Sequence, residues 1–207
     1  MSETRVILIG GPPMVGKSTL ARSLAARLGF GCVSTDDIGL AIGSVTTPTA
    51  HPRQHAMGTA DYREYYITHS VDDLLADAMR GHEEMWPAIE AIVKAHAEWA
   101  DPLIIEGWAL WPERVATLGY NNVAAMWLSA DAGFLESQTR AALRFYQGAS
   151  NEEAMIQNFV ARNVRYNELM MSAATSLGLA TMHVIAETSI DDLTEQCMQR
   201  LVPSTRS

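Results

Sequence analysis

The feature that most constrains this chain is a glycine-rich turn between an apolar run and a helical pattern near the N-terminus. Four apolar residues at 6–9 lead into Gly-x-x-x-x-Gly-Lys-Ser at 11–18, and apolar residues recur with helical spacing from residue 20. This strand–loop–helix order is typical of a phosphate-binding loop. We therefore expect the backbone N–H groups of the loop, and the positive end of a helix over 17–28, to face a polyphosphate.

Two residues of this loop have specific expected roles. Lys17 is expected to place a mobile cation on the β- and γ-phosphates, and the Ser18 hydroxyl is expected to be a magnesium ligand. The predicted nucleotide-binding residues are Gly11, Pro12, Pro13, Met14, Val15, Gly16, Lys17, Ser18 and Thr19.

Strand-like segments alternate with helical patterns along the chain. The expected strands are 5–9, 31–34, 102–105, 122–128 and 180–185. This alternation indicates an α/β fold in which helices cover both faces of a parallel sheet. We expect residues 1–207 to form a single three-layer domain with a five-stranded sheet.

Local signals mark several helix ends. Capping-box patterns begin at Asp61, Ser150 and Ser189. Pro87 and Pro112 are each predicted to lie in the first turn of a helix. The segment 43–58, rich in Thr, Pro, His and Gly, is predicted to be the longest loop.

Composition argues against several classes of partner. The net charge is −9 and no run of lysine or arginine occurs, so neither nucleic acid nor an acidic membrane surface is an expected partner. Cys32 and Cys197 lie far apart in no metal-binding spacing, which favours a reducing compartment. With neither a signal-peptide pattern nor a membrane-spanning apolar segment, a cytoplasmic protein is expected. A homodimer is left open.

An acidic pair follows the second expected strand. Because the carboxyl ends of parallel strands face the ligand crevice, Asp36 is expected near the γ-phosphate. There it could accept a proton from an attacking hydroxyl, or hold magnesium through water. The alternative is that Asp36 or Thr35 caps the next helix. We favour the catalytic interpretation because of the loop upstream, and Asp37 is interpreted as a cap or as a residue on the substrate side.

The third expected strand ends in Glu106-Gly107-Trp108. Glu106 is interpreted either as a carboxylate near magnesium or as an ordinary strand end, and the sequence does not separate the two. Trp108 adjoins Gly107 at the expected crevice and is a candidate for ligand contact. The tryptophans at 86, 99 and 111 are more typical of a core or an interface.

Arginines follow on two helical segments. In the pattern from 152 to 177, Arg162 and Arg165 lie opposite an apolar stripe, where they form either a solvated face or part of a site. Phosphoryl transfer needs cations beyond Lys17, so we rank Arg162 first, with Arg144 and Arg165 as lid candidates. Arg140 is a further candidate. The expected lid spans about 140–165, with a hinge at 145–151.

These motifs together resemble the small-molecule branch of P-loop kinases, the group that contains shikimate, gluconate and chloramphenicol kinases and the zeta toxins. The resemblance covers the loop, Ser-Thr-Asp-Asp-Ile at 34–38, Glu-Gly at 106–107, and the helix 162–168, which is similar to an Arg-x-x-x-Tyr-x-Glu helix. Residues 105–112 also resemble the Glu-Gly-x-His-x-x-Pro stretch of 2-phosphoglycerate kinases, with Ala109 in place of the histidine.

The resemblance implies a P-loop NTPase fold with a helical lid, and ATP- and Mg²⁺-dependent transfer of the γ-phosphoryl group to a hydroxyl or acidic group of a small molecule. Lys17 would stabilise phosphate charge, Asp36 would orient or deprotonate the acceptor and bind metal, and Arg162 would clamp the transferring group. The acceptor would bind segment 39–80, and adenine would pack near 186–189. The expected acceptor-side residues are Asp37, Arg63, Glu106, Gly107 and Trp108.

Other classes of function are left open by the sequence. The chain could be a nucleotide-binding regulator that hydrolyses ATP slowly. Its acceptor could also be a nucleotide, a nucleoside or a protein. A third alternative, a kinase of nucleic-acid ends, is disfavoured by the net charge of −9.

Overall fold

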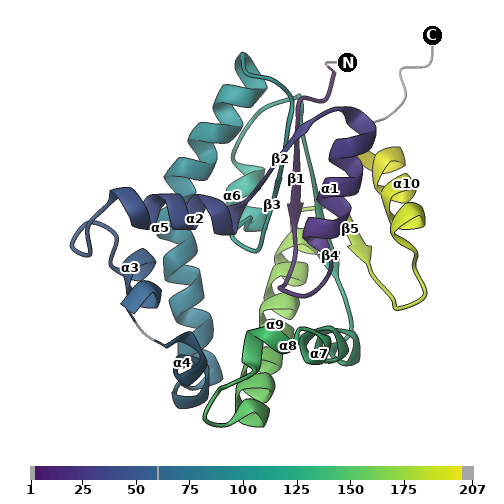
Figure 1. Ribbon diagram of the computed structural model, residues 1–207. Coiled ribbons are helices and arrows are strands. Elements are labelled where there is room, and N and C mark those ends of the chain that lie inside the picture. The colour runs from purple at the N-terminus through teal and green to yellow at the C-terminus, as the bar shows by residue number, and fades with distance from the viewer. Residues whose placement is uncertain (1–2, 60, 202–207) are drawn as a thin grey trace.

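A five-stranded parallel sheet organises the computed structural model, which describes residues 3–59 and 61–201 (Figure 1). The strand order is β2-β3-β1-β4-β5, and every neighbouring pair is parallel. The strands are β1 Val6–Gly10, β2 Gly31–Ser34, β3 Leu103–Glu106, β4 Val123–Ser129 and β5 Thr181–His183. All five predicted strands are confirmed, although β5 is shorter than predicted.

Helices cover both faces of the sheet. In Figure 1, α1 and α10 lie together on one side, and α2, α5 and α6 lie on the other. The helices in the described residues are α1 Lys17–Leu28, α2 Thr35–Val45, α3 Pro52–Thr59, α4 Tyr62–Thr68, α5 Val71–Glu98, α6 Pro112–Ala116, α7 Ala132–Ala141, α8 Leu143–Tyr146, α9 Glu152–Ser176 and α10 Ile190–Leu201. The predicted α/β architecture is confirmed.

The central strand β1 shows why two layers of helices are needed. Successive side chains of a strand point to opposite faces of a sheet. Val6 and Leu8 lie in a core cluster with residues of α5 and α9, whereas Ile7 and Ile9 lie in a second cluster with residues of α1 and α10. All four side chains are fully buried, so each face of β1 requires its own cover.

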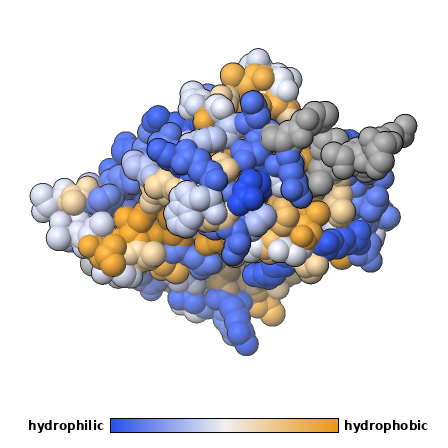
Figure 2. Space-filling model, turned by 90° about the horizontal axis from the view of Figure 1, so that it is seen from above, coloured by the Kyte–Doolittle hydropathy of each residue, from blue (hydrophilic) through white to orange (hydrophobic). Residues whose placement is uncertain are grey.

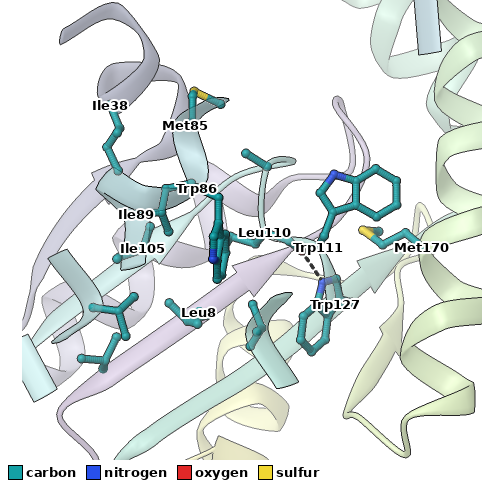
Figure 3. Close-up of a cluster of buried hydrophobic side chains, with 14 of the residues drawn as sticks. Leu8, Ile38, Met85, Trp86, Ile89, Ile105, Leu110, Trp111, Trp127 and Met170 are labelled. Atoms are coloured by element: carbon teal, nitrogen blue, oxygen red, sulfur yellow. Dashed lines mark hydrogen bonds between the residues drawn. The ribbon is translucent and has the colours of Figure 1, made fainter. Parts of the chain in front are cut away.

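Aromatic side chains fill the first cluster (Figure 3). Trp86, Trp111 and Trp127 are buried, and the indole N–H of Trp127 donates to the carbonyl oxygen of Leu110 at 2.8 Å. The prediction of core positions is thus confirmed for Trp86 and Trp111. Trp99 differs, because it follows the last residue of α5 and is 77% exposed.

Two predictions, a helix start at Pro87 and a long loop at 43–58, are wrong. Pro87 lies inside α5, not in the first turn of a helix. Both Pro87 and Glu83 are exposed, so water can hydrogen-bond the Glu83 carbonyl that would otherwise accept from residue 87. The predicted loop 43–58 is largely helical, because α2 continues to Val45 and α3 begins at Pro52.

Side-chain caps confirm two of the three predicted helix starts. The Asp61 carboxylate accepts from the backbone N–H of Arg63 at 3.0 Å, and the Ser189 hydroxyl accepts from that of Asp192 at 3.1 Å. The prediction for Ser150 is wrong, since Asn151 caps α9 through the N–H of Ala154. Ser150 donates instead to a carboxylate of α4.

Hydrophilic and hydrophobic residues both contribute to the protein surface. Viewed from above, one face shows hydrophilic residues interspersed with hydrophobic ones (Figure 2). Across residues 3–59 and 61–201, no helix has the length and apolar character that crossing a membrane would require.

Replacing Gly10 by alanine tests the packing of β1 against β4. A Cβ atom at Gly10 would overlap the ring of Trp127, which is fully buried and has no room to move aside. We expect Gly10→Ala to lower the free energy of unfolding by about 1–3 kcal/mol, the usual cost of overpacking a core. Chemical denaturation of the purified protein measures this change.

Gly133→Ala is the matched control. Gly133 is exposed, and nothing lies within 4 Å of a Cβ built there. Its unfolding free energy should not fall, and a rise of up to about 1 kcal/mol is expected because alanine is favoured over glycine within α7. Equal effects of the two substitutions would contradict the packing argument.

Candidate active site

The phosphate-binding loop connects β1 to α1 at the carboxyl edge of the sheet (Figure 1). Its backbone is tightly turned, with φ of 145° at Gly11, 69° at Met14 and 96° at Gly16, the residue that precedes α1. No side chain caps α1, so the N–H groups of its first turn are available to an anion. Thr19, in that turn, is exposed.

Lys17 is buried at the base of this loop. Its side chain is 7% exposed, and Nζ donates to the carbonyl oxygen of Pro12 at 2.8 Å. Burial lowers the pKa of Lys17 to about 8, although the carboxylates of Glu106 and Asp36 act in the opposite direction. The ammonium group is therefore held inside the loop, within the electrostatic range of both carboxylates.

Glu106 reaches the loop from the neighbouring strand. In the sheet it pairs with Ile9 of β1 on one side and Ser34 of β2 on the other, so the ends of three strands are aligned. The Ser18 hydroxyl donates to Glu106 Oε1 at 2.9 Å, and the Glu106 side chain is buried.

Asp36 lies in the first turn of α2, with its carboxylate exposed. Capping by Asp36 or Thr35, the alternative interpretation, is wrong, because Ser34 caps α2 by accepting from the N–H of Asp36 at 3.2 Å. The Asp36 carboxylate instead accepts from the indole N–H of Trp108 at 3.0 Å. Asp37 is exposed in the same turn.

Gly107 permits the close approach of β3 and α2. Its φ is 154°, and a Cβ there would overlap both Cβ and Oγ1 of Thr35. Thr35 is fully buried, and its hydroxyl has no hydrogen-bond partner among the described residues. A larger residue at position 107 would therefore separate Glu106 from the start of α2.

Arg162 is buried in an aromatic enclosure, not on a solvated face. The guanidinium is 4.6 Å from the ring centroid of Trp108, and Nη2 donates to the hydroxyl of Tyr66 at 3.1 Å. The side chain is 2% exposed, and its Nε has no partner. Within residues 3–59 and 61–201, no carboxylate forms an ion pair with it.

His82 is a site neighbour that the sequence analysis missed. It is 3% exposed on α5, and its ring centroid lies 4.3 Å from that of Trp108. Burial lowers the pKa of His82 to about 3, and the charges of Arg162 and then Lys17 act in the same direction. The sequence contained one indication of this burial. His82 lies three and four residues before Met85 and Trp86, on the apolar stripe of α5.

The oxygen atoms at the loop fit a magnesium ion. Mg²⁺ is usually held by one or two carboxylates together with substrate phosphates and water. Ser18 and Glu106 provide a hydroxyl and a buried carboxylate in contact. In the described part of the chain, no group of three or more His, Cys, Asp or Glu residues could hold a metal ion by itself.

The sequence and fold of this chain are similar to those of several named kinases. No family model matches the chain. A 2-phosphoglycerate kinase of Pyrococcus horikoshii is 29% identical over 174 residues, which are 80% of this chain and 58% of that protein. Shikimate kinase from Acinetobacter baumannii in complex with shikimate has a TM-score of 0.53 at 14% identity, covering 95% of this chain and 92% of that one. A gluconokinase from Sinorhizobium meliloti 1021 has a TM-score of 0.51 at 12% identity, covering 96% and 92%.

The fold is shared with the solved shikimate kinase and gluconokinase. The predicted resemblance to small-molecule kinases is confirmed by these neighbours. The chain spans less than two thirds of the length of the 2-phosphoglycerate kinase that it matches.

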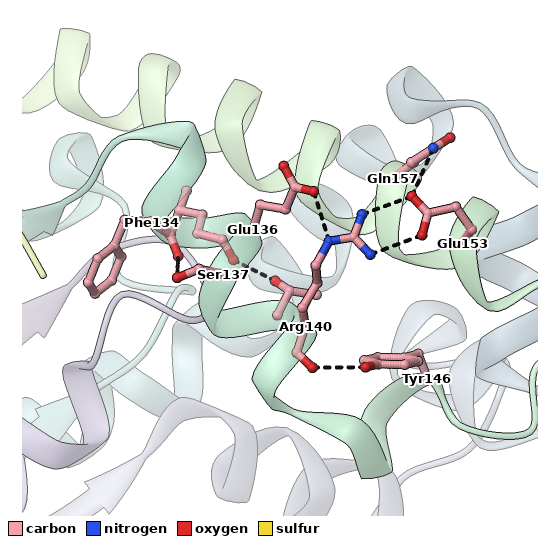
Figure 4. A network of polar contacts seen from close by, with 9 residues as sticks. Phe134, Glu136, Ser137, Arg140, Tyr146, Glu153 and Gln157 are labelled. Carbon is pink, nitrogen blue, oxygen red and sulfur yellow. Dashed lines mark hydrogen bonds and ion pairs between the residues drawn. The ribbon is translucent and has the colours of Figure 1, made fainter.

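The arginines expected in the lid have different surroundings. Arg140 binds Glu136 at 2.8 Å and both carboxylate oxygens of Glu153 at 2.8 and 2.9 Å (Figure 4). Those bonds lower the pKa of Glu153 to about 2. Arg165 forms an ion pair with Asp72 at the surface. Arg144 is exposed, and no described residue pairs with its guanidinium.

Helix α4 contacts both α8 and the segment between α8 and α9. The Tyr62 hydroxyl donates to the carbonyl oxygen of Phe145 at 2.7 Å, and the Glu64 carboxylate accepts from both the N–H and the hydroxyl of Ser150. Arg63 lies beside them, with its guanidinium 4.7 Å from the Tyr62 ring and a weak bond to the Arg144 carbonyl at 3.4 Å. These contacts join the expected acceptor segment to the expected lid.

A surface pocket lies beside the end of β5. It is lined by residues of α7, among them Phe134 and Ser137, and by residues 184–187 that follow the strand. Ala186 and Glu187, at the start of the segment expected near adenine, are part of this pocket.

Proton uptake on nucleotide binding tests the environment of Lys17. With a pKa of about 8, Lys17 is largely deprotonated at pH 8.5, and the phosphates of ATP should restore its charge. We expect binding of MgATP at pH 8.5 to take up roughly 0.7 proton, and binding at pH 7 to take up far less. Calorimetry in buffers of different ionisation enthalpy measures this uptake.

Two variants serve as controls for that experiment. Lys17→Arg keeps a cation that does not titrate, and it should abolish the uptake. Lys94→Met removes an exposed lysine and should leave the uptake unchanged. Binding enthalpies that do not depend on the buffer at pH 8.5 would contradict the lowered pKa.

Proposed function

We propose that this protein is an ATP- and Mg²⁺-dependent kinase that transfers the γ-phosphoryl group of ATP to a hydroxyl of a small molecule. The observation that carries the proposal is the contact of Ser18 with the buried Glu106 beside Lys17, at the edge where Asp36 also lies. Groups that can bind phosphate and oxygen atoms that can bind Mg²⁺ lie together at this edge. The Asp36 carboxylate is next to them and does not cap α2, because Ser34 does.

In the proposed reaction, the loop amides and Lys17 hold the β- and γ-phosphates. Ser18 and Glu106 would hold the magnesium ion, which supplies charge neutralisation at the phosphates. Asp36 accepts the proton of the acceptor hydroxyl as its oxygen bonds to the γ-phosphorus. The bond between that phosphorus and the bridging oxygen breaks, and ADP leaves. Asp36, predicted to hold the metal through water, would do so from the same edge, with Glu106 as the carboxylate in contact with Ser18.

The acceptor is proposed to bind on the side of Trp108 and Arg162. Support comes from the buried guanidinium of Arg162, which no described carboxylate neutralises. A buried cation without an ion-pair partner is stabilised when a ligand brings an anion. Because the Pyrococcus relative is named 2-phosphoglycerate kinase, 2-phosphoglycerate leads the acceptor screen, followed by gluconate and shikimate.

The proposal extends to the organisation of the chain. We assign residues 1–207 to one kinase domain, with the acceptor segment at about 39–80 and the lid at about 140–165. The bonds of α4 to Phe145 and Ser150 support the closure of one segment over the other. A cytoplasmic location is proposed because Cys32 and Cys197 are both free.

Asp36→Asn tests the catalytic assignment. An amide cannot accept the acceptor proton, but it keeps the size of the side chain and its oxygen for the Trp108 bond. We expect phosphotransfer to fall about 10²- to 10⁴-fold while MgATP affinity changes little. A coupled assay of ADP release with each acceptor, together with calorimetry of MgATP, measures both quantities.

Asp37→Asn is the matched control, since Asp37 is the exposed neighbour in the same turn. Its effect should be much the smaller of the two. If Asp36→Asn left the rate unchanged, a regulatory ATPase would replace the kinase as the better assignment.

Arg144→Ala tests the lid. Arg144 is the lid arginine whose guanidinium no described residue engages, so it is the one free to reach the transferring group. We expect its loss to lower kcat about 10²-fold, as removal of a transition-state cation does. Steady-state kinetics measures the effect.

Arg165→Ala provides the comparison in the same assay. The Arg165 guanidinium is held by Asp72, and an exposed pair of this kind contributes little to stability. A loss of kcat as large as that of Arg144→Ala would show that this ion pair opens during the reaction.

A further inference from the structure

Trp108 is the hydrogen-bond partner of the Asp36 carboxylate. The indole N–H donates to Oδ1 at 3.0 Å, and no other described side chain bonds either carboxylate oxygen. The bond from Ser34 that caps α2 reaches only the backbone N–H of Asp36. An exposed aspartate that is held at one oxygen keeps one orientation, whereas an unheld one exchanges between rotamers.

The ring of Trp108 is itself held in place. The guanidinium carbon of Arg162 lies 4.6 Å from its centroid, and the ring centroids of His82 and Trp108 are 4.3 Å apart with the two planes at 85°. Both neighbours are buried, Arg162 on α9 and His82 on α5. The backbone is also fixed, because the carbonyl oxygen of Trp108 accepts from the hydroxyl of Tyr166.

His82 supports the indole without adding a charge. Its Nδ1 accepts from the indole N–H of Trp111 at 3.0 Å, which fixes the imidazole against the core. Burial lowers the pKa of His82 to about 3, and the charges of Arg162 and then Lys17 act in the same direction. The imidazole is therefore neutral near pH 7, and its edge-on contact with Trp108 is a packing contact.

The two oxygens of Asp36 are available to different partners. A general base must present a lone pair within hydrogen-bond reach of the hydroxyl that it deprotonates. With Oδ1 bound to the indole of Trp108, Oδ2 has no partner among the described residues. The indole N–H thus orients the carboxylate without occupying the oxygen that an acceptor needs.

We propose that Trp108 is a positioning residue for the reaction: its indole N–H holds Asp36 by Oδ1, so that Oδ2 is presented to the acceptor hydroxyl. This proposal rests on the proposed kinase function and deepens it by naming the group that orients its base. Trp108 acts through Asp36 and takes no part in the proton transfer. Its own orientation is set by Arg162 and His82, which lie against its ring.

NMR of the isotopically labelled protein tests the contact without any substrate. The chain has five tryptophans, and the indole N–H signal that is missing from Trp108→Phe belongs to Trp108. Asp36→Ala removes the acceptor oxygen, so we expect this signal to move upfield and its proton to exchange faster with water. Asp37→Ala, at the exposed neighbour in the same turn, should move it far less. A signal that Asp36→Ala does not move would overturn the proposal.

Trp108→Phe tests the effect on catalysis. Phenylalanine keeps an aromatic ring against Arg162 but has no N–H, so Asp36 loses its partner. We expect kcat for the best acceptor among 2-phosphoglycerate, gluconate and shikimate to fall roughly 10- to 100-fold, as for the loss of a hydrogen bond to a charged group. The KM values of MgATP and of the acceptor should change much less than kcat, because the oriented carboxylate acts in the transition state.

Trp108→His is the rescue variant. Its ring carries an N–H at a similar reach, and near pH 8 it is neutral and can donate to Asp36. We expect it to recover part of the kcat that Trp108→Phe loses. Trp99→Phe, at an exposed tryptophan, should keep the original kcat. Thermal unfolding confirms that the compared variants are folded.

The outcomes separate this inference from the proposed function. Phosphotransfer with an unchanged or raised kcat in Trp108→Phe would overturn the positioning role and keep the kinase. Equal losses of kcat in Trp108→Phe and Trp108→His would assign the indole a packing role and also overturn the inference. If no acceptor were phosphorylated while the indole signal still depended on Asp36, the contact would stand, but the kinase and the positioning role would both be overturned.

Discussion

The parallel pairing of β3 between β1 and β2 is the constraint on which the rest of the site depends. It aligns Glu106 with Ile9 and Ser34, so the loop after β1, the carboxylate of β3 and the start of α2 meet at one edge of the sheet. The hydrogen bond from Ser18 to Glu106 joins the first turn of α1 to the end of β3. A shift of one residue in this register would direct Glu106 to the opposite face and leave the loop without its carboxylate.

The charged side chains at this edge of the sheet differ from those at the surface. At the protein surface, several cations have carboxylate partners, as Arg140 has in two glutamates and Arg165 in Asp72. At the site, Lys17 and Arg162 are buried, and Arg162 has no ion-pair partner among the described residues. Such an arrangement is costly in the free protein, and the proposed anionic substrates would relieve that cost.

Much of the fold was predictable because its signals are local. Each strand is a short apolar run, and the alternation of strands and helices leaves few ways to build a parallel sheet. Predictions failed where the same local sequence pattern is compatible with two structures. Pro87 is compatible with a helix interior when the affected carbonyl faces water. At the start of α9, two adjacent residues can each act as a cap, and Asn151 takes this role in place of Ser150.

The sequence by itself determined the phosphate-binding loop, the order of strands and helices, and the position of acidic residues at strand ends. These follow from residue spacing over a few turns of chain. Only the tertiary structure decided that Glu106 contacts Ser18, that Trp108 binds Asp36, and that His82 faces the same indole as Arg162. The physical reason is distance along the chain: these partners are separated by 72 to 88 residues in the first two cases, and their contact depends on how whole helices pack against the sheet.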